Sequence, residues 1–499
     1  MAVVGFLGDI GANVTDYGND IGSGGRSVNS IGVFRIIIQL LLLFIRIFLK
    51  LGSRLLQLGQ SRLKPVEEGD FCVHTSVLPR NPDSGSCSPN EFKETLLDEV
   101  TGLSEISKHS FEDKLYENII SAIDIVDIVH FHGYKIHEHV VRTKDGYLLS
   151  IHRIMPKDCS SATNLDGRPV VYMQHGLLTN SELFVLGDTS SRCLPFRLVD
   201  LGYDVWLGNN RGNKYSRKHL VLSAEENRFW DYSMDEFALF DIPDSINHVL
   251  NVTKQSNLSY IGFSQGSAQA LAALSLNPEL NSKINVFIGL SPALIPRGLN
   301  NPFCSFLANS APELLYGFFG RRAILPSVIF WQKLFGPKIF EQVVDLSLKF
   351  LFDWKSENIS LTQKKVGYPH LFSPSSVKSV IHWFQIISSR RFQMFDDGGS
   401  CGSKLVYLSG AGTKANRVAP FPTKTITTPM LLIYGESDML IDIGRTLDEL
   451  SCNVEVIGIP GYEHMDTLWA KDVETTVFDK VAEKLNYYNG TIKEKYLEL

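Results

Sequence analysis

The pentapeptide GFSQG at residues 262–266 constrains the fold more than any other stretch of this chain. An apolar run at residues 258–261 precedes it, and the Ala/Leu-rich run SAQALAALSL at residues 267–276 follows it. The first run predicts a short strand and the second predicts a helix. A serine hydroxyl becomes a useful nucleophile when a tight turn exposes it to a base, and flanking glycines let that turn form. The pattern therefore predicts a nucleophile elbow with Ser264 at its tip.

The rest of the chain from residue 108 alternates apolar strands with helical patterns. A hairpin is predicted at residues 134–154, and further strands are predicted at 169–173, 203–207, 258–261, 285–290, 430–434 and 454–459. This alternation is typical of an α/β fold with a mainly parallel sheet that helices cover on both faces. Ligand chemistry in such a sheet gathers at the carboxyl ends of the strands.

Between residues 292 and 399 the strand pattern stops. This insert is dense in aromatic residues and proline, which predicts helices and turns. It can be interpreted as a structural helical subdomain or as a cap over the active site. We predict a cap or lid, because the insert interrupts the sheet just after the nucleophile strand. Residues 108–291 and 400–499 then form the catalytic core.

Two polar residues follow the last predicted strands and complete a set for nucleophilic catalysis. Asp438 ends the strand at 430–434, and His464 lies in a loop after the run at 454–459. A serine nucleophile needs a histidine as base and an acid that orients it, and the chain order Ser, Asp, His is that of α/β-hydrolases. Asp442 competes for the acidic role, but we favour Asp438 because it lies directly at the strand end.

Backbone N–H groups are expected to stabilise the oxyanion. One belongs to Gln265, which follows the nucleophile, and the other is predicted at Leu177 in the motif HGLL at residues 175–178. We interpret His175 in the same motif as a packing and hydrogen-bonding residue. No metal or organic cofactor is implied.

The composition argues against other classes of protein. The formal net charge is -6, with no basic excess and no nucleic-acid-binding motif, so a nucleic-acid partner is not expected. The seven cysteines are odd in number and form no CxxC pair, which is typical of reduced thiols and not of a disulfide framework or a metal site.

The N-terminal part of the chain has three segments. Residues 1–30 are polar and lack the basic cluster and short apolar core of a signal peptide, residues 31–64 are mostly apolar, and residues 65–107 read as a linker. On a helical wheel, the polar residues of the middle segment form one stripe about 100° wide. These residues are Arg35, Gln39, Arg46, Lys50, Arg54 and Gln57. This pattern favours a membrane-associated helix that lies in a lipid interface.

Two other interpretations of residues 31–64 stay open: a helix that spans a bilayer, and an amphipathic helix packed on the hydrolase domain. Within this segment the apolar core is followed by basic residues with no acidic residue among them, namely Arg46, Lys50, Arg54, Arg62 and Lys64, whereas Asp9, Asp16 and Asp20 precede Ile31. This charge bias would hold the catalytic domain in the cytosol even if the helix spans.

Longer motifs carry a family resemblance that extends from about Asp124 to near Leu485. The chain resembles the acid-lipase family of α/β-hydrolases, and within it the fungal membrane-bound steryl ester hydrolases of lipid droplets. The motifs are HGLL at 175–178, GYDVWLGNNRGNKYS at 202–216, FWDYSMDEFALFDIPDSI at 229–246, GFSQGS at 262–267 and GYEHMDTLW at 461–469.

The resemblance implies a triad of Ser264, Asp438 and His464, an oxyanion hole at the backbones of Leu177 and Gln265, and a cap that binds acyl chains. It also implies sterol esters as substrates, with acylglycerols second, and a location at the lipid droplet monolayer or the endoplasmic reticulum membrane. Alternatives are a triacylglycerol lipase or phospholipase with the same triad, and a non-catalytic lipid-binding protein. A binding protein has no need of the three catalytic residues.

These patterns generate a first prediction. Removal of residues 31–64 should leave an enzyme that cleaves detergent-dispersed esters but no longer collects on lipid droplets, because the interfacial helix is gone. Fluorescence microscopy of tagged full-length and truncated proteins measures this. Droplet localisation of the truncated protein at the full-length level would assign targeting to another segment.

Overall fold

The computed structural model describes residues 114–157, 165, 167–298, 301–324, 328–397 and 418–490. The predicted segments 1–30, 31–64 and 65–107 lie outside these residues. None of the described helices is both long and apolar enough to span a membrane.

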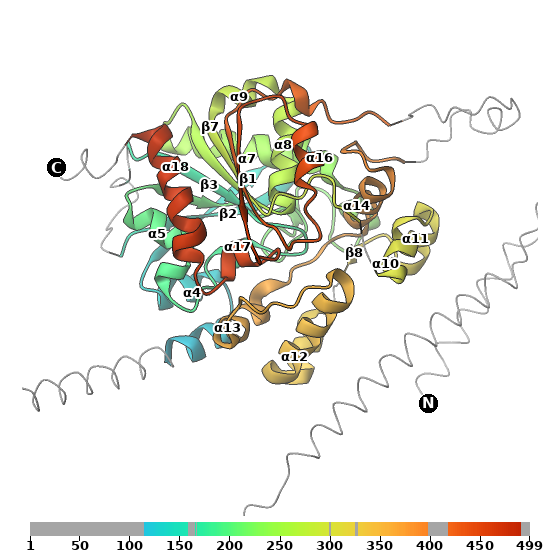
Figure 1. The fold of residues 1–499 in the computed structure, drawn as a ribbon, viewed down its shortest axis with the longest axis horizontal. Coiled ribbons are helices and arrows are strands. Elements are labelled where there is room, and N and C mark those ends of the chain that lie inside the picture. The colour runs from blue at the N-terminus through green and yellow to red at the C-terminus, as the bar shows by residue number, and fades with distance from the viewer. Residues whose placement is uncertain are drawn as a thin grey trace, which may run out of the picture. The chain divides into compact units, whose positions relative to one another are not determined.

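A nine-stranded sheet forms the centre of the structure (Figure 1). Eight strands follow the order β1-β2-β4-β3-β6-β7-β10-β11, and the short β5 pairs with β2. Their bounds are β1 Lys135–Arg142, β2 Tyr147–Met155, β3 Val170–Gln174, β4 Asp204–Leu207, β5 Lys218–His219, β6 Leu258–Phe263, β7 Ile284–Leu290, β10 Met430–Gly435 and β11 Val454–Ile459. Strands β1 and β2 form the predicted antiparallel hairpin, and β4, β3, β6, β7, β10 and β11 pair in parallel. The mainly parallel sheet predicted from the sequence is confirmed.

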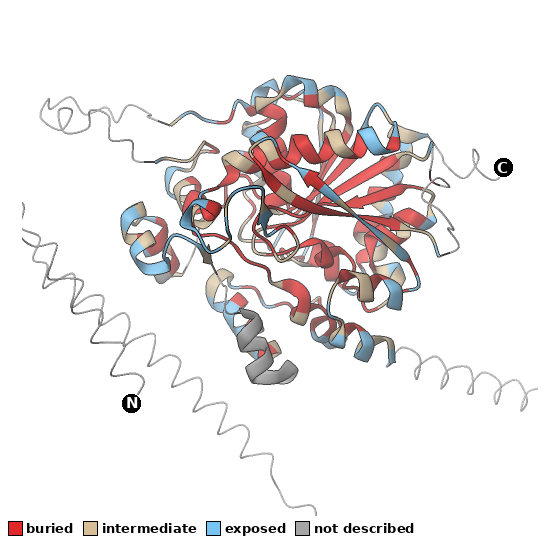
Figure 2. Cartoon of the chain, turned by 180° about the vertical axis from the view of Figure 1, so that it is seen from behind, coloured by how far each residue is buried: buried red, intermediate tan, exposed pale blue. Residues whose placement is uncertain are grey.

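Successive strand residues point to opposite sides of the sheet, and here both sets are apolar. Helices therefore cover both faces. In β3, Val171 and Met173 pack in one buried cluster with residues of α5 (Leu194–Asp200) and α18 (Asp479–Asn489). Tyr172 packs in a second cluster with residues of α7 (Ile242–Thr253) and α8 (Gln265–Leu276). Figure 2 shows the central strands buried between these layers, and β3, β4 and β6 are buried at every residue.

Shorter helical elements complete the core. The α-helices are α4 Ile125–Phe131, α6 Met234–Glu236, α9 Pro278–Lys283, α16 Ile443–Asp448 and α17 Asp466–Trp469. In the described part of the chain, 3-10 turns lie at Ser181–Phe184, Ser190–Arg192, Asn227–Trp230 and Thr423–Thr425, and π-helical turns lie at Phe237–Asp241 and Glu474–Phe478.

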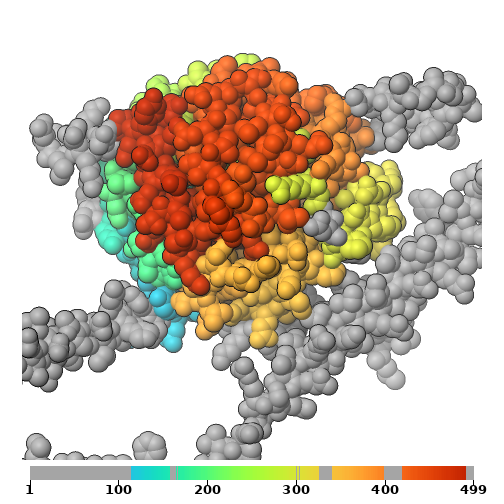
Figure 3. Space-filling view, in the orientation of Figure 1, coloured from blue at the N-terminus to red at the C-terminus, as the bar shows by residue number. Residues whose placement is uncertain are grey.

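The insert between β7 and β10 is mostly helical, as the sequence indicates. Its helices are α10 Pro302–Ala308, α11 Pro312–Phe319, α12 Val328–Phe352, α13 Leu361–Leu371 and α14 Val377–Ser389. A two-stranded ribbon of β8 (Ala323–Ile324) and β9 (Ser375–Ser376) was not predicted. In the space-filling view, the amber residues of this insert lie directly against the orange C-terminal residues (Figure 3). We call residues 292–397 the cap.

Helix α8 lies unusually close to the end of β3, and a glycine makes this possible. A Cβ atom added to Gly266 would lie 2.2 Å from the carbonyl oxygen of Gln174 and 2.7 Å from that of His175. Both carbonyl oxygens belong to the backbone, so neither can rotate away from an added Cβ atom. The elbow therefore needs glycine at this position.

The second prediction compares two glycines. Gly266→Ala should lower the free energy of unfolding by about 3 kcal/mol, because the methyl group overpacks a rigid junction. Gly317→Ala is the control, since a Cβ atom there meets nothing within 4 Å and α11 should gain up to about 1 kcal/mol. Urea unfolding of both variants measures the difference, and equal stabilities would show that the close approach is not essential.

Candidate active site

Ser264 lies at the tip of the turn between β6 and α8, as predicted. Its φ is 53° and its ψ is -118°, a conformation that a residue with a side chain adopts only under constraint. The constraint comes from both sides: Ser264 N–H donates to the carbonyl oxygen of Leu290 over 3.0 Å, and Ser267 Oγ donates to that of Gly262 over 2.7 Å. Ser264 remains partly exposed although its neighbours are buried. Local strain of this kind is typical of functional turns.

Asp438 and His464 meet at the ends of β10 and β11. His464 Nδ1 lies 2.6 Å from Asp438 Oδ2, and the two residues are 3% and 1% exposed. The second carboxylate oxygen accepts the backbone N–H of Leu440 over 2.9 Å. A hydrogen bond from Nδ1–H to the carboxylate leaves Nε2 with a free lone pair, which is the state that a general base requires.

The loops that carry these residues are joined to each other and to the elbow. Ser437 N–H donates to the carbonyl oxygen of Tyr462 over 3.0 Å, and Ser291 Oγ donates to that of His464 over 2.8 Å. The ring of Phe263, which precedes Ser264, lies 5.2 Å from the His464 ring between centroids. Ser264, Asp438 and His464 thus gather at the carboxyl edge of the sheet.

The competing carboxylate lies elsewhere. Asp442 is the N-cap of α16, where its Oδ1 accepts the N–H of Arg445 over 3.3 Å. Its Oδ2 lies 3.6 Å from Arg445 and 3.9 Å from Arg390. Asp442 therefore caps a helix and pairs with arginines, whereas Asp438 contacts His464.

The loop predicted to supply the second oxyanion donor abuts the nucleophile. A Cβ atom added to Gly176 would lie 3.1 Å from the Cβ of Ser264. The Gly176 carbonyl accepts from His175 Nδ1 over 2.8 Å and from Thr179 Oγ1 over 3.0 Å. That carbonyl and the Leu177 N–H belong to one planar peptide group. Fixing the carbonyl therefore also fixes the direction of the Leu177 N–H.

His175 serves this loop as a neutral hydrogen-bonding residue, as predicted. Its Nδ1 donates to Gly176, while its Nε2 accepts the N–H of Asn210 over 3.1 Å. Burial lowers its pKa to about 4, because a charged imidazole would lose its hydration. Both ring nitrogens of His175 already form hydrogen bonds within the protein, so this histidine is not available as a second base.

Gln265 is the first residue of α8, so its N–H has no acceptor within the helix. Its side chain is held by the cap: Trp383 Nε1 on α14 donates to Gln265 Oε1 over 2.6 Å. Trp383 is not predicted from the sequence, because no local pattern distinguishes it from other aromatic residues of the cap. Among the described residues, no group of three or more His, Cys, Asp or Glu side chains is arranged to hold a metal ion.

The third prediction concerns the acid. Asp438→Asn should lower kcat on a soluble ester by about 10,000-fold, because His464 loses the anion that sets its tautomer and orientation. Asp442→Asn should leave kcat within a few-fold of the parent, since it changes a helix cap. Steady-state kinetics on both purified variants measure this, and the opposite ranking would identify Asp442 as the orienting acid.

Comparison with known proteins agrees with this geometry. A partial alpha/beta-hydrolase lipase region matches residues 125–188, and the alpha/beta hydrolase fold matches residues 169–471. A probable lipase of Schizosaccharomyces pombe is 47% identical over 76% of this chain and 83% of its own length. The human lysosomal acid lipase/cholesteryl ester hydrolase is 31% identical over 73% of this chain and 91% of its own. The rat gastric triacylglycerol lipase is 32% identical over 72% and 90%. The chain therefore belongs to the acid-lipase-like family of α/β-hydrolases and is a carboxylic ester hydrolase.

Proposed function

We propose that the protein hydrolyses long-chain fatty acid esters of sterols. The observation that carries this proposal is the buried Asp438–His464 pair beside the strained Ser264, beneath an aromatic cap. The sterol ester as substrate is supported by the resemblance to fungal steryl ester hydrolases and by the name of the human relative. We place the enzyme at the lipid droplet surface or the endoplasmic reticulum membrane, with its catalytic domain in the cytosol.

The reaction follows from the roles assigned to the three residues. His464 Nε2 takes the proton of Ser264 Oγ, and Oγ attacks the ester carbonyl carbon. The N–H groups of Leu177 and Gln265 stabilise the oxyanion. The bond to the sterol oxygen breaks, His464 returns the proton to that oxygen, and the acyl group stays on Ser264. Water, deprotonated by His464, then attacks the acyl carbonyl carbon. The bond from this carbon to Ser264 Oγ breaks, His464 returns the proton to Oγ, and the fatty acid leaves.

The surface of the cap supports a lipid substrate. Several large apolar side chains on its helices are at least one third exposed, and they are Phe306, Phe318, Phe319, Leu346 and Phe350. Exposed apolar side chains such as these are suited to contact with a lipid interface. An ester that is insoluble in water must be taken from such an interface.

Triacylglycerol is the second candidate substrate, because the rat gastric triacylglycerol lipase is as similar to this chain as the human cholesteryl ester hydrolase. Both substrates would be cleaved by the same triad. The difference lies in how the cap accommodates a rigid sterol or a branched acylglycerol.

The fourth prediction is a substrate ranking for the full-length protein in detergent. Cholesteryl and ergosteryl oleate should be cleaved faster than trioleoylglycerol or phosphatidylcholine, with release of oleate as the measurement. Ser264→Ala is the control and should lose at least about 1,000-fold in kcat. Faster cleavage of trioleoylglycerol would assign an acylglycerol lipase. Retained activity in Ser264→Ala would refute the mechanism, and binding without hydrolysis would indicate a lipid-binding protein.

A further inference from the structure

One side chain of the cap lies flat against the imidazole of His464. The rings of Trp354 and His464 are 5.1 Å apart between centroids and only 11° from parallel. Trp354 is 7% exposed and follows the end of α12. We propose that Trp354 is a positioning residue, whose ring fixes the plane of the His464 imidazole during catalysis. This inference rests on the proposed role of His464 as the base.

The hydrogen bond to Asp438 alone does not fix that plane. A single bond at Nδ1 sets one direction of the ring and lets the imidazole tilt about the line that joins the two atoms. The Phe263 ring contacts His464 at an angle of 56°, so it bounds the imidazole without lying parallel to it. The parallel contact with Trp354 limits the remaining tilt and so keeps Nε2 directed at the nucleophile.

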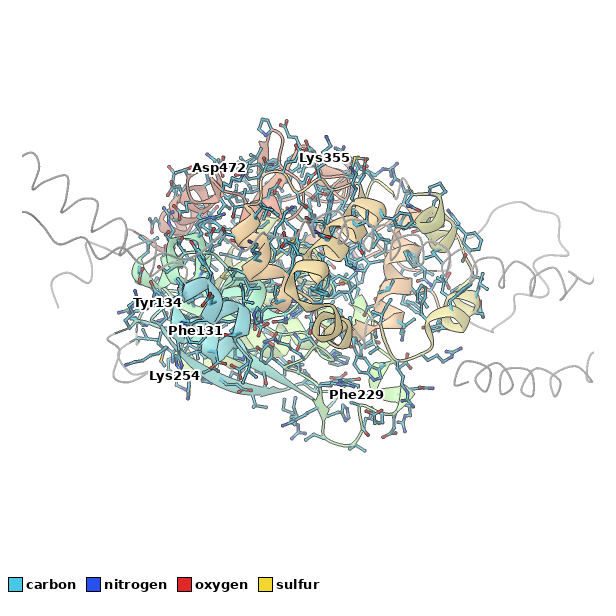
Figure 4. All side chains as sticks on the ribbon, turned by 90° about the horizontal axis from the view of Figure 1, so that it is seen from below. Phe131, Tyr134, Phe229, Lys254, Lys355 and Asp472 are labelled. Carbon is cyan, nitrogen blue, oxygen red and sulfur yellow. The ribbon has the colours of Figure 1, made fainter. Side chains whose placement is uncertain are left out.

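The residues next to each ring are clamped together. The backbone N–H of Lys355 (labelled in Figure 4) lies 2.9 Å from the Glu463 carboxylate, and the N–H of Ser356 lies 2.8 Å from it. Glu463 precedes His464, and Lys355 follows Trp354. The stacked pair is therefore held by bonds one residue away on each side.

Further bonds anchor the same segment of the cap to the His464 loop. Asn358 Nδ2 donates to the carbonyl oxygen of Gly461 over 2.9 Å and to Asp466 Oδ2 over 2.8 Å. Asp353 has a φ of 56° and Ser356 has a φ of 55°, both unfavourable for residues with side chains. The chain adopts this irregular path where it delivers the indole ring to His464.

The indole nitrogen of Trp354 gives a second reason to assign the positioning role to the face of its ring. Buried tryptophans usually donate their N–H to an acceptor, but Trp354 Nε1 is buried and has no hydrogen-bond partner among the described residues. Its N–H therefore does not explain a tryptophan here. The contact of the ring face with His464 explains it. The Phe352 ring also stacks on the indole, with ring centroids 4.7 Å apart and planes 28° from parallel.

Phe352 also connects this stack to the protein surface. It lines a cavity of about 220 Å³ together with Phe350, Met439 and Leu440. Met439 and Leu440 directly follow Asp438, so the cavity lies beside the loop that carries this carboxylate. The end of α12 is thus in contact with the base through two aromatic rings.

The test is kinetic and uses the purified full-length protein in detergent with p-nitrophenyl butyrate, a short soluble ester. Trp354→Leu should lower kcat about 10-fold to 100-fold with KM within about 3-fold, because a misplaced base slows chemistry and not binding. Trp354→Phe keeps an aromatic face and should restore kcat to within about 3-fold of the parent. Unchanged kcat in Trp354→Leu, or a rise in KM alone, would overturn the proposal.

A control separates positioning from general loosening of the cap. Tyr368→Phe removes the 2.6 Å hydrogen bond to Asp345, which joins α13 to α12 away from His464. This variant should lower the melting temperature without lowering kcat. If Tyr368→Phe lowers kcat as much as Trp354→Leu does, Trp354 acts only by stabilising the cap, and the proposal is wrong.

Glu463→Ala provides a second variant that alters no core side chain. It removes the clamp and should lower kcat with little change in KM, like Trp354→Leu. Combining the two changes should cost less than the product of the single effects, because both act on one ring contact. Fully multiplicative effects would contradict the proposal. Ser264→Ala in the same assay tests the triad separately, so loss of the proposed function and loss of this inference give different results.

Discussion

The short contact between His464 Nδ1 and Asp438 Oδ2 is the constraint around which the carboxyl edge of the sheet is arranged. Burying an imidazole and a carboxylate costs free energy unless each has a hydrogen-bond partner. The two loops must therefore be placed accurately enough for this hydrogen bond to form. Parallel pairing of β10 and β11 brings both strand ends to one edge. Gly435 allows the final approach, because a Cβ atom there would lie 2.1 Å from the Tyr462 carbonyl oxygen.

The oxyanion loop depends on a different electrostatic condition. His175 must stay neutral, because its Nε2 accepts the N–H of Asn210 while its Nδ1–H holds the Gly176 carbonyl. Its pKa of about 4 lies below the usual value of 6.5, so the neutral form adds stability at pH values above 6.5. That contribution is lost as the pH falls toward 4.

The sequence predicted the elements whose signals are local. The strand at 258–261, the helix after Ser264 and the order of Asp438 and His464 all follow from short patterns, and the structure contains them where expected. The contacts of Trp354 and Trp383 could not be predicted in this way. Each depends on packing between segments about 110 to 120 residues apart, and aromatic residues are frequent throughout the cap. The sequence offers both Asp438 and Asp442 as partners of His464, and the structure places Asp438 beside His464 and Asp442 at a helix cap.

These long-range contacts change the interpretation of the cap. Trp383 donates to the Gln265 side chain and Trp354 stacks on His464. Ser373 N–H donates to the carbonyl oxygen of Leu178 over 2.8 Å. The cap therefore contacts three of the four loops that form the site, namely those that carry Ser264, His464 and Leu177. Replacing the cap with that of a relative would also replace these contacts. The exchange would therefore change the geometry of the loops together with the substrate preference.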